Sequence, residues 1–91
     1  MSVLVQLPPV LRSVSGGERS LCADGGSIGA VLGDLTRKHP TLALHLFDEA
    51  GAIRHNIVFL YAGAVIRAKD AAVHRLNSGD EIIITNALAG G

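Results

Sequence analysis

Aromatic residues are scarce in this sequence: they make up 3% of its 91 residues, with two Phe, one Tyr and no Trp. Proteins that bind single-stranded nucleic acid usually stack bases on aromatic side chains, so this scarcity argues against such a platform. The eight Lys and Arg residues balance the eight Asp and Glu residues, which leaves no net charge to attract nucleic acid or an anionic membrane. We therefore expect a protein partner.

The sequence also lacks a long hydrophobic run. Its longest apolar stretch, residues 57–66, is interrupted by Gly63 and is far shorter than the ~20 residues that a membrane-spanning helix needs. The first residues do not have the basic and apolar segments of a secretion signal. The single cysteine, Cys22, cannot form an internal disulfide, which fits a reducing compartment. These features predict a soluble, cytoplasmic protein.

Aliphatic residues supply the core that aromatic residues do not, because 48% of the chain is hydrophobic. A chain of this length forms one domain with one core. Residues 3–7 alternate between two faces and predict a first strand that Pro8 ends. Residues 13–18 contain two glycines and predict a hairpin loop, after which residues 19–23 return as an antiparallel strand.

The hydrophobic period then changes to that of a helix. Its apolar stripe consists of Ile28, Val31, Leu32 and Leu35. Either Ser27 or Asp24 is placed to cap its first turn, two basic residues, Arg37 and Lys38, favour the negative end of its dipole, and Pro40 ends it. One main helix is therefore expected to lie across a sheet.

The second half of the chain predicts further strands. Residues 41–48 indicate a short helix or turn at one edge of the core, and residues 70–76 have no regular pattern. The remaining expected elements are a strand at 57–61, a turn at 62–63, a strand at 65–67, a turn at 77–80 and a last strand at 81–85.

This element order predicts an α+β fold with a mixed sheet of four to five strands and one main helix packed across one face. A single helix covers only one side of such a sheet. The residues expected in the core are Val5, Ile57, Phe59, Ile82 and Ile84. The apolar residues expected on the opposite side, which we name the open-face patch, are Leu4, Val58, Leu60 and Ile83. Such a patch is typical of a protein interface, although scattered exposed aliphatic residues are also normal.

The chain ends in a thin segment. We expect a folded domain over residues 1–87, followed by a flexible tail at residues 88–91 with the sequence LAGG. Glycine has no Cβ, so Gly90 and Gly91 suit a narrow channel that delivers a carboxyl carbon to another protein's active site. Chain ends are often small for no functional reason, so the tail alone does not decide between these interpretations.

The chain resembles the ubiquitin-like β-grasp sulfur carriers of the MoaD/ThiS family, whose members serve molybdopterin, thiamin and cysteine synthesis. The residues that carry this resemblance are 76–82 (LNSGDEI), 87–91 (ALAGG), Leu7-Pro8 with Leu11-Arg12, Gly16-Gly17, and 28–31 (IGAV). They look most like the cysteine-pathway carriers. The chain departs from the family at Ala62, where an Asn is frequent, and at Asn86, near which a Pro is frequent.

The resemblance implies a sulfur carrier that is not itself an enzyme. An E1-like partner would use ATP and magnesium to adenylate the Gly91 carboxylate, sulfur would displace AMP to give a thiocarboxylate, and a second enzyme would consume it. Leu88, Ala89 and Gly90 would lie in a partner's channel, and the open-face patch would dock the partner. The carrier would bind no cofactor itself and would be a monomer when free.

No other residues in the sequence form a pattern able to catalyse this reaction. The histidines His39, His45, His55 and His74 lie on separate elements without close ligand spacing, so we expect no metal site. Cys22 is expected to be a small, partly buried strand residue, and Asp80-Glu81 to serve a turn.

The sequence leaves two other functions open. The chain could be a ubiquitin-like modifier joined through Gly91 to lysines, since the same adenylate can pass to an amine. It could also be a non-covalent β-grasp interaction domain, which would not need Gly90 and Gly91.

Overall fold

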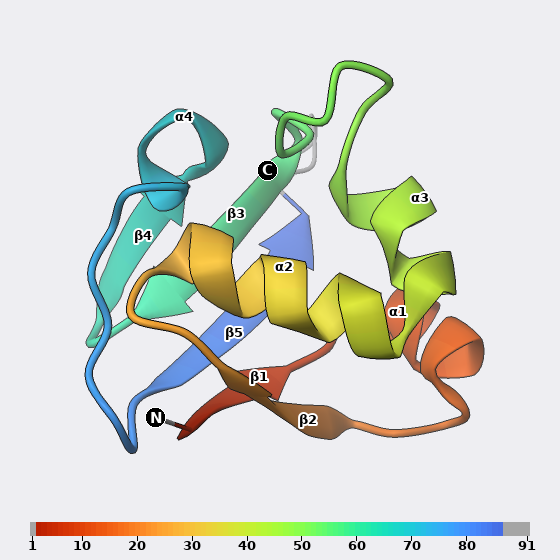
Figure 1. The fold of residues 1–91 in the computed structure, drawn as a ribbon, viewed down its shortest axis with the longest axis horizontal. Helices are drawn as coiled ribbons and strands as arrows, with labels where there is room; N and C mark the ends of the chain where they lie inside the picture. The colour runs from red at the N-terminus through yellow and green to blue at the C-terminus, as the bar shows by residue number, and fades with distance from the viewer. Residues whose placement is uncertain (1, 87–91) are drawn as a thin grey trace.

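A computed structural model describes residues 2–86, which form one sheet with helices packed against it (Figure 1). The strands are β1 (Ser2–Gln6), β2 (Ser20–Asp24), β3 (Ile57–Tyr61), β4 (Ala64–Arg67) and β5 (Glu81–Asn86). The α-helices are α1 (Pro9–Arg12), α2 (Ile28–Lys38), α3 (Ala43–Leu46) and α4 (Ala68–Ala71). Two 3₁₀ helices, η1 (Ser13–Ser15) and η2 (Pro40–Leu42), precede β2 and α3.

The sheet has five strands in the order β2-β1-β5-β3-β4. Strands β1 and β5 are parallel, whereas the pairs β1–β2, β3–β5 and β3–β4 are antiparallel. The last strand of the chain is therefore the central strand of the sheet, with β1 on one side and β3 on the other. The predicted mixed sheet with one main helix is confirmed.

Helix α2 forms where the apolar stripe predicted it. Ser27 has extended backbone, and its Oγ accepts a hydrogen bond of 3.1 Å from the Ala30 N–H, so Ser27 rather than Asp24 is the N-cap. Further along the helix, the Asp34 carboxylate accepts a 2.9 Å hydrogen bond from the Asp24 N–H and forms ion pairs with Arg37 and Lys38. This carboxylate joins α2 to the end of β2.

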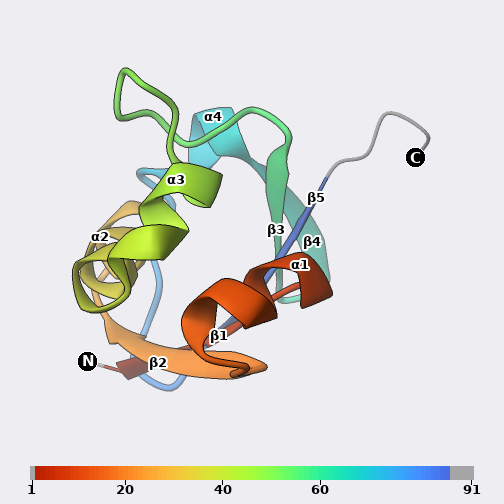
Figure 2. The same ribbon diagram turned by 90° about the vertical axis from the view of Figure 1, so that its right-hand side faces the viewer.

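The core lies between α2 and one side of the sheet. Figure 2 shows α2 and α3 together on this side. The sheet residues that point to α2 are almost completely buried: Val3, Val5, Ile57, Phe59, Ile82 and Ile84. The helix stripe Ile28, Val31, Leu32 and Leu35 is fully buried against them. Burial of each such large aliphatic or aromatic side chain contributes about 1.5–3 kcal/mol, so this layer stabilises the fold strongly.

The connection between β1 and β2 is more structured than the predicted loop at residues 13–18. Helix α1 and η1 occupy residues 9–15, and the turn follows at Gly16 and Gly17, which have φ of 79° and 87°. Pro9 stands at the first helical position, where its fixed φ favours a helix and its missing N–H costs nothing. The prolines that end β1 therefore also begin α1, which buries Leu11.

The second half of the chain agrees with the prediction at one element and differs from it at two. The region 41–48 forms η2 and α3, which confirms the predicted short helix, and β5 extends one residue further than predicted, to Asn86. Part of the region that showed no pattern belongs to α4, which buries Ala68 and Ala71. Near it, a Cβ on Gly29 would lie 2.5 Å from the Ala72 carbonyl oxygen, so glycine permits α2 to pack closely against the segment after α4.

Candidate functional site

Strand β5 determines where the tail leaves the domain. It is hydrogen-bonded on both sides, to β1 and to β3, and its last residue, Asn86, lies opposite Ile57 at the start of β3. A central strand cannot shift its register without moving its buried residues to the other side of the sheet. The end of β5 at Asn86 is therefore fixed relative to β3. The predicted tail residues Leu88, Ala89, Gly90 and Gly91, and the predicted domain boundary after residue 87, lie outside the described residues.

The open-face patch lies on the side of the sheet opposite α2. Leu60 on β3 and Ile83 on β5 are directly opposite each other, and each is 37% exposed. Val58 is two residues before Leu60 on β3 and is half-buried. Leu4 on β1 is also half-buried, but its partner on β5 is Glu81 rather than an apolar residue. The structure therefore brings Val58, Leu60 and Ile83 together, with Leu4 to one side.

The sequence prediction omitted a further apolar residue of this surface. Val65 on β4 lies opposite Leu60 and is 61% exposed. The two-residue turn between β3 and β4 fixes this register, so the turn was the signal that could have located Val65. Leu60 and Ile83 also line a shallow hollow of about 450 Å³, together with Tyr61, Ala62, Gly63 and Glu81. The exposed apolar surface is therefore wider than predicted and contains a depression.

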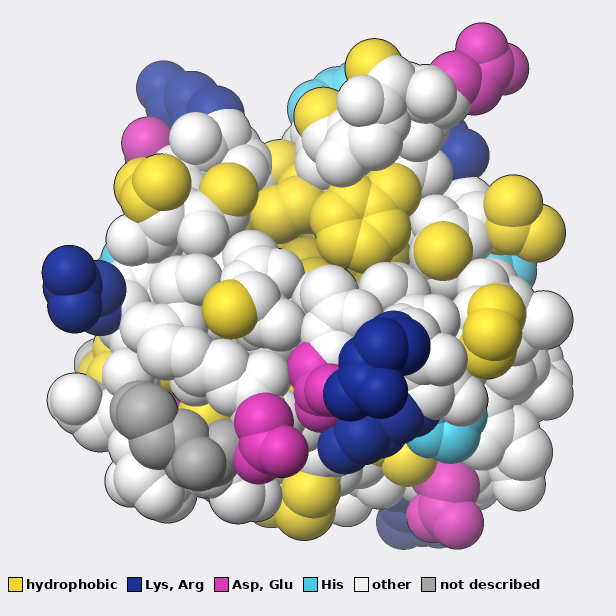
Figure 3. Space-filling view, in the orientation of Figure 1, with side chains coloured by type: hydrophobic (Ala, Val, Ile, Leu, Met, Phe, Trp, Pro, Cys, Tyr) yellow, Lys and Arg dark blue, Asp and Glu magenta, His cyan; other side chains and the backbone are white. Residues whose placement is uncertain are grey.

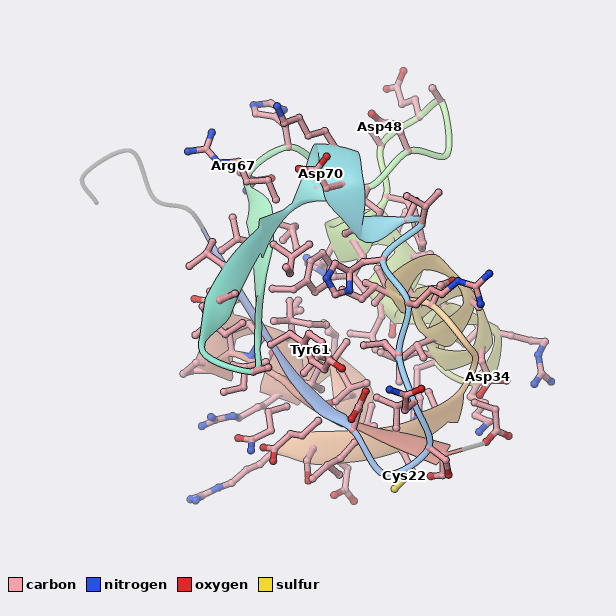
Figure 4. The ribbon with its side chains drawn as sticks, turned by 90° about the vertical axis from the view of Figure 1, so that its left-hand side faces the viewer. Cys22, Asp34, Asp48, Tyr61, Arg67 and Asp70 are labelled. Carbon is pink, nitrogen blue, oxygen red and sulfur yellow. The ribbon has the colours of Figure 1, made fainter. Side chains whose placement is uncertain are left out.

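The β1–β2 end of the same side is polar. Gln6 donates a hydrogen bond to the Glu81 carboxylate, next to Leu4. Cys22, which lies opposite Leu4 on edge strand β2, is exposed, so the expectation that it is partly buried is wrong. Its register with Leu4 places it on the side that α2 does not cover. Figure 4 shows Cys22 and Arg67 at opposite ends of the molecule.

A hydrogen-bonded group holds the turn that precedes β5. The Tyr61 hydroxyl donates to Asp80 Oδ2 at 2.6 Å, and the same oxygen accepts the Asn77 N–H at 2.7 Å. The bond from Tyr61, and then the one from Asn77, lowers the pKa of Asp80, and the Asp80 carboxylate raises the pKa of Tyr61. The predicted turn role of Asp80 is confirmed. It joins the end of β3 to the start of β5.

Two further hollows lie around α4. One, of about 510 Å³, is lined by Gly29, Phe47, Ile53 and Ala72 among others, and Figure 3 shows hydrophobic atoms at its base. The other, of about 290 Å³, is lined by His55, Arg67, Ala68 and Lys69, and we name it the basic hollow. Sequence reasoning missed the basic hollow because His55 comes from a different segment than Arg67 and Lys69, which lie at the junction of β4 and α4.

The described part of the chain has no group of three or more His, Cys, Asp or Glu residues that could hold a metal ion. Within residues 2–86, no helix has the length and apolar composition needed to cross a membrane.

Known proteins that resemble this chain match it over nearly its whole length and nearly their own. The sulfur carrier protein CysO of Mycobacterium tuberculosis is 31% identical over 93 residues, with full coverage of both chains. The small archaeal modifier protein 1 of Methanosarcina acetivorans is 31% identical, covers 99% of this chain and 96% of its own, and has a TM-score of 0.79. The crystal structure of the Amycolatopsis orientalis BexX/CysO complex contains a chain that is 25% identical, with 98% and 99% coverage and a TM-score of 0.81.

No protein-family profile matches the chain. The structural relatives nevertheless confirm the predicted ubiquitin-like β-grasp fold, since their TM-scores are close to 0.8 over nearly the whole chain.

Proposed function

Because the chain belongs to the CysO family of ubiquitin-like sulfur carrier proteins, we propose that it carries sulfur as a thiocarboxylate on Gly91. The observation that supports this proposal most is the 31% identity to the mycobacterial carrier over the full length of both chains. The chain acts as a protein co-substrate in this proposal. Its partners supply the catalytic groups, ATP and magnesium.

The chemistry follows from the poor reactivity of a carboxylate, whose charge is shared by two oxygens. One oxygen of the Gly91 carboxylate attacks the α-phosphorus of ATP, and pyrophosphate leaves. A sulfide or the outer sulfur of a persulfide then attacks the carbonyl carbon of the acyl-adenylate, and AMP leaves with the attacking oxygen. When the donor is a persulfide, a thiol then cleaves the acyl disulfide, which releases the thiocarboxylate while the thiol and the donor sulfur form a disulfide. One oxygen of the carboxyl group has then been replaced by sulfur, and a second enzyme takes this sulfur for the synthesis of a cofactor, cysteine or another metabolite.

The fold supports this proposal in two ways. Strand β5 is the central strand, so the origin of the tail is held by hydrogen bonds on both sides. Beside it, Val58, Leu60 and Ile83 form an apolar surface that an E1-like partner can bind while Leu88, Ala89 and Gly90 enter its channel. The BexX/CysO complex is a structure of a related carrier with a partner protein.

Intact-mass spectrometry tests the proposal. The chain is incubated with its cognate activating enzyme, ATP, magnesium and a sulfur source. We expect a mass increase equal to the difference between one sulfur and one oxygen atom, and we expect the same reaction to fail without Gly91. An unchanged mass with the active cognate enzyme would refute the sulfur-carrier proposal.

The similarity to the archaeal modifier protein favours one second candidate, in which Gly91 is joined to lysines of other proteins. The last Lys or Arg of the chain is Arg75, so trypsin would leave residues 76–91 on each modified lysine. Mass spectrometry of cellular proteins for this long remnant distinguishes the two functions. Its presence would support the modifier function, and its absence together with thiocarboxylate formation would support the carrier.

A further inference from the structure

The basic hollow concentrates positive charge near the point where the tail begins. His55 precedes β3, Arg67 is the last residue of β4, and Lys69 belongs to α4. All three side chains are exposed, and none of them forms a hydrogen bond or ion pair with another described residue. None of the described residues that line this hollow is acidic. The hollow is therefore suited to an anion.

The strand register places this hollow within reach of the tail. Thr85 on β5 lies opposite Val58 on β3, which lies opposite Arg67 on β4, so the three residues share one side of the sheet. Two strand spacings separate Thr85 from Arg67, about 10 Å. His55 is two residues before Ile57, which is opposite Asn86. Figure 4 shows Arg67 where β4 meets α4.

The tail of the same chain is the anion that we consider for this hollow. Residues 87–91 are Ala, Leu, Ala, Gly and Gly, so in the proposed function their only charge is the carboxylate of Gly91. Five residues span up to about 17 Å when extended, which exceeds the distance to Arg67, and the two glycines permit the backbone to turn back. A carboxylate on so short a connection has an effective concentration in the millimolar range near the hollow. A site with a dissociation constant in the millimolar range would then be about half occupied.

We propose that the basic hollow binds the C-terminal carboxylate of its own chain and holds the tail against the domain until a partner binds it. The guanidinium of Arg67 and the ammonium of Lys69 form charge-assisted hydrogen bonds with carboxylates, and His55 adds a donor at the side nearest β3. The effect of this docking on activation by a partner enzyme rests on the proposed function. A docked carboxylate cannot be in a partner's channel, so docking lowers the fraction of the chain that is competent for activation.

Nuclear magnetic resonance of the free protein tests the docking directly. The full chain is compared with the same chain carrying a C-terminal amide, which has the same length but no terminal charge. We expect the backbone amides of His55, Arg67 and Lys69 to differ in chemical shift between the two forms. We expect these differences to disappear in about 1 M salt, where the Debye length is ~3 Å. Differences limited to residues next to the C-terminus would overturn the proposal.

Charge-removal variants supply the matched control. In the Arg67→Gln, Lys69→Gln double variant, the shift differences at residue 55 should be lost. In Arg19→Gln, which removes an exposed arginine next to the opposite edge strand β2, they should remain. Loss of the differences in Arg19→Gln as well would overturn the assignment to the hollow. Shift differences that grow with protein concentration would also overturn it, because they would identify the tail of a second copy as the occupant.

The consequence for activation has its own measurement. If half of the tails are docked, the double variant should bind the cognate activating enzyme with an apparent affinity up to about twofold higher. The reason is that the whole population of the variant is competent to bind. Failure of the docking would leave thiocarboxylate formation intact. Failure of the sulfur-carrier proposal would leave the chemical-shift differences intact, so the two outcomes are distinguishable.

Discussion

The two sides of the sheet are built from alternate residues of the same strands, but they differ in burial. On β5, Ile82 and Ile84 are fully buried, whereas Ile83 between them is 37% exposed. On β3, Phe59 is fully buried, whereas the next residue, Leu60, is 37% exposed. Helix α2 covers one side only, which produces this difference. Aliphatic residues of the same type therefore stabilise the fold on one side and are partly exposed on the other, where we propose that a partner binds.

The difference in burial between the two sides is clearest within β5, because residues 82–84 are three consecutive isoleucines. Ile84→Ala should lower the free energy of unfolding by about 2–5 kcal/mol, since it removes buried methyl groups and leaves a cavity. Ile83→Ala should lower it by less than about 1 kcal/mol, since surface substitutions have small effects. Urea unfolding measures both variants. Equal losses would show that the uncovered side also belongs to the core.

Charged substitutions separate binding from folding on the uncovered side. Leu60→Asp and Ile83→Asp should each reduce the rate of adenylation by the cognate enzyme by about tenfold or more, because a buried carboxylate without a partner is costly to desolvate. The variants should still fold, since both side chains already contact water. Adenylation rates and circular dichroism measure the two effects.

Val73→Asp is the matched control for these variants. Val73 is an exposed apolar residue, 81% exposed, that lies outside the sheet strands. Its substitution should leave the adenylation rate unchanged. If Leu60→Asp and Ile83→Asp were adenylated at the rate of the unchanged protein, the open-face patch would not be the docking surface.

Local hydrophobic periods were sufficient to predict most of the sheet and α2. The alternation of side chains along a strand separates Val5, Phe59 and Ile84 from Leu4, Leu60 and Ile83. Because β3 and β5 are apolar on both sides, their hydrophobic pattern alone does not show which set the helix covers. The short helices α1 and α4 have four residues each, which is too few to show a helical period. They form because a proline at the first position or buried alanines favour a single turn.

Features that depend on the approach of distant segments could not be predicted from the sequence. Cys22 is exposed because β2 is an edge strand whose register with β1 places it opposite Leu4. His55, Arg67 and Lys69 line one hollow because the β3–β4 hairpin brings the end of β4 back beside the start of β3. A linear pattern contains no signal for either arrangement.

The hydrogen bond between Tyr61 and Asp80 joins the buried side of β3 to the turn before β5, and it should give a pH-dependent stability. Tyr61→Phe should cause a small loss, because it removes the donor while keeping the ring. The pKa of Asp80 is lowered in the folded state, so the contribution is present above the ordinary Asp pKa and is lost as the pH falls through the lowered value. The pKa of Tyr61 is raised, so the contribution is lost again as the pH rises through that raised value.

Thermal unfolding of the two proteins across the pH range measures this contribution. The difference between them should be constant between the ordinary Asp and Tyr pKa values and should decrease at both ends. A difference that does not change with pH would show that the Tyr61 hydroxyl stabilises the fold independently of the charge on Asp80.

A substitution in the turn between β3 and β4 should change the stability of the fold without affecting the uncovered side of the sheet. Ala62 and Gly63 both have positive φ, 52° and 82°, as in a type I′ turn, and alanine is strained in this conformation. Ala62→Asn should therefore increase the free energy of unfolding by about 0.5–1 kcal/mol, since asparagine adopts positive φ more readily. Ala62 also lines the hollow that contains Leu60 and Ile83. An unchanged adenylation rate in this variant would limit the docking surface to the strands, whereas a reduced rate would extend it to the turn.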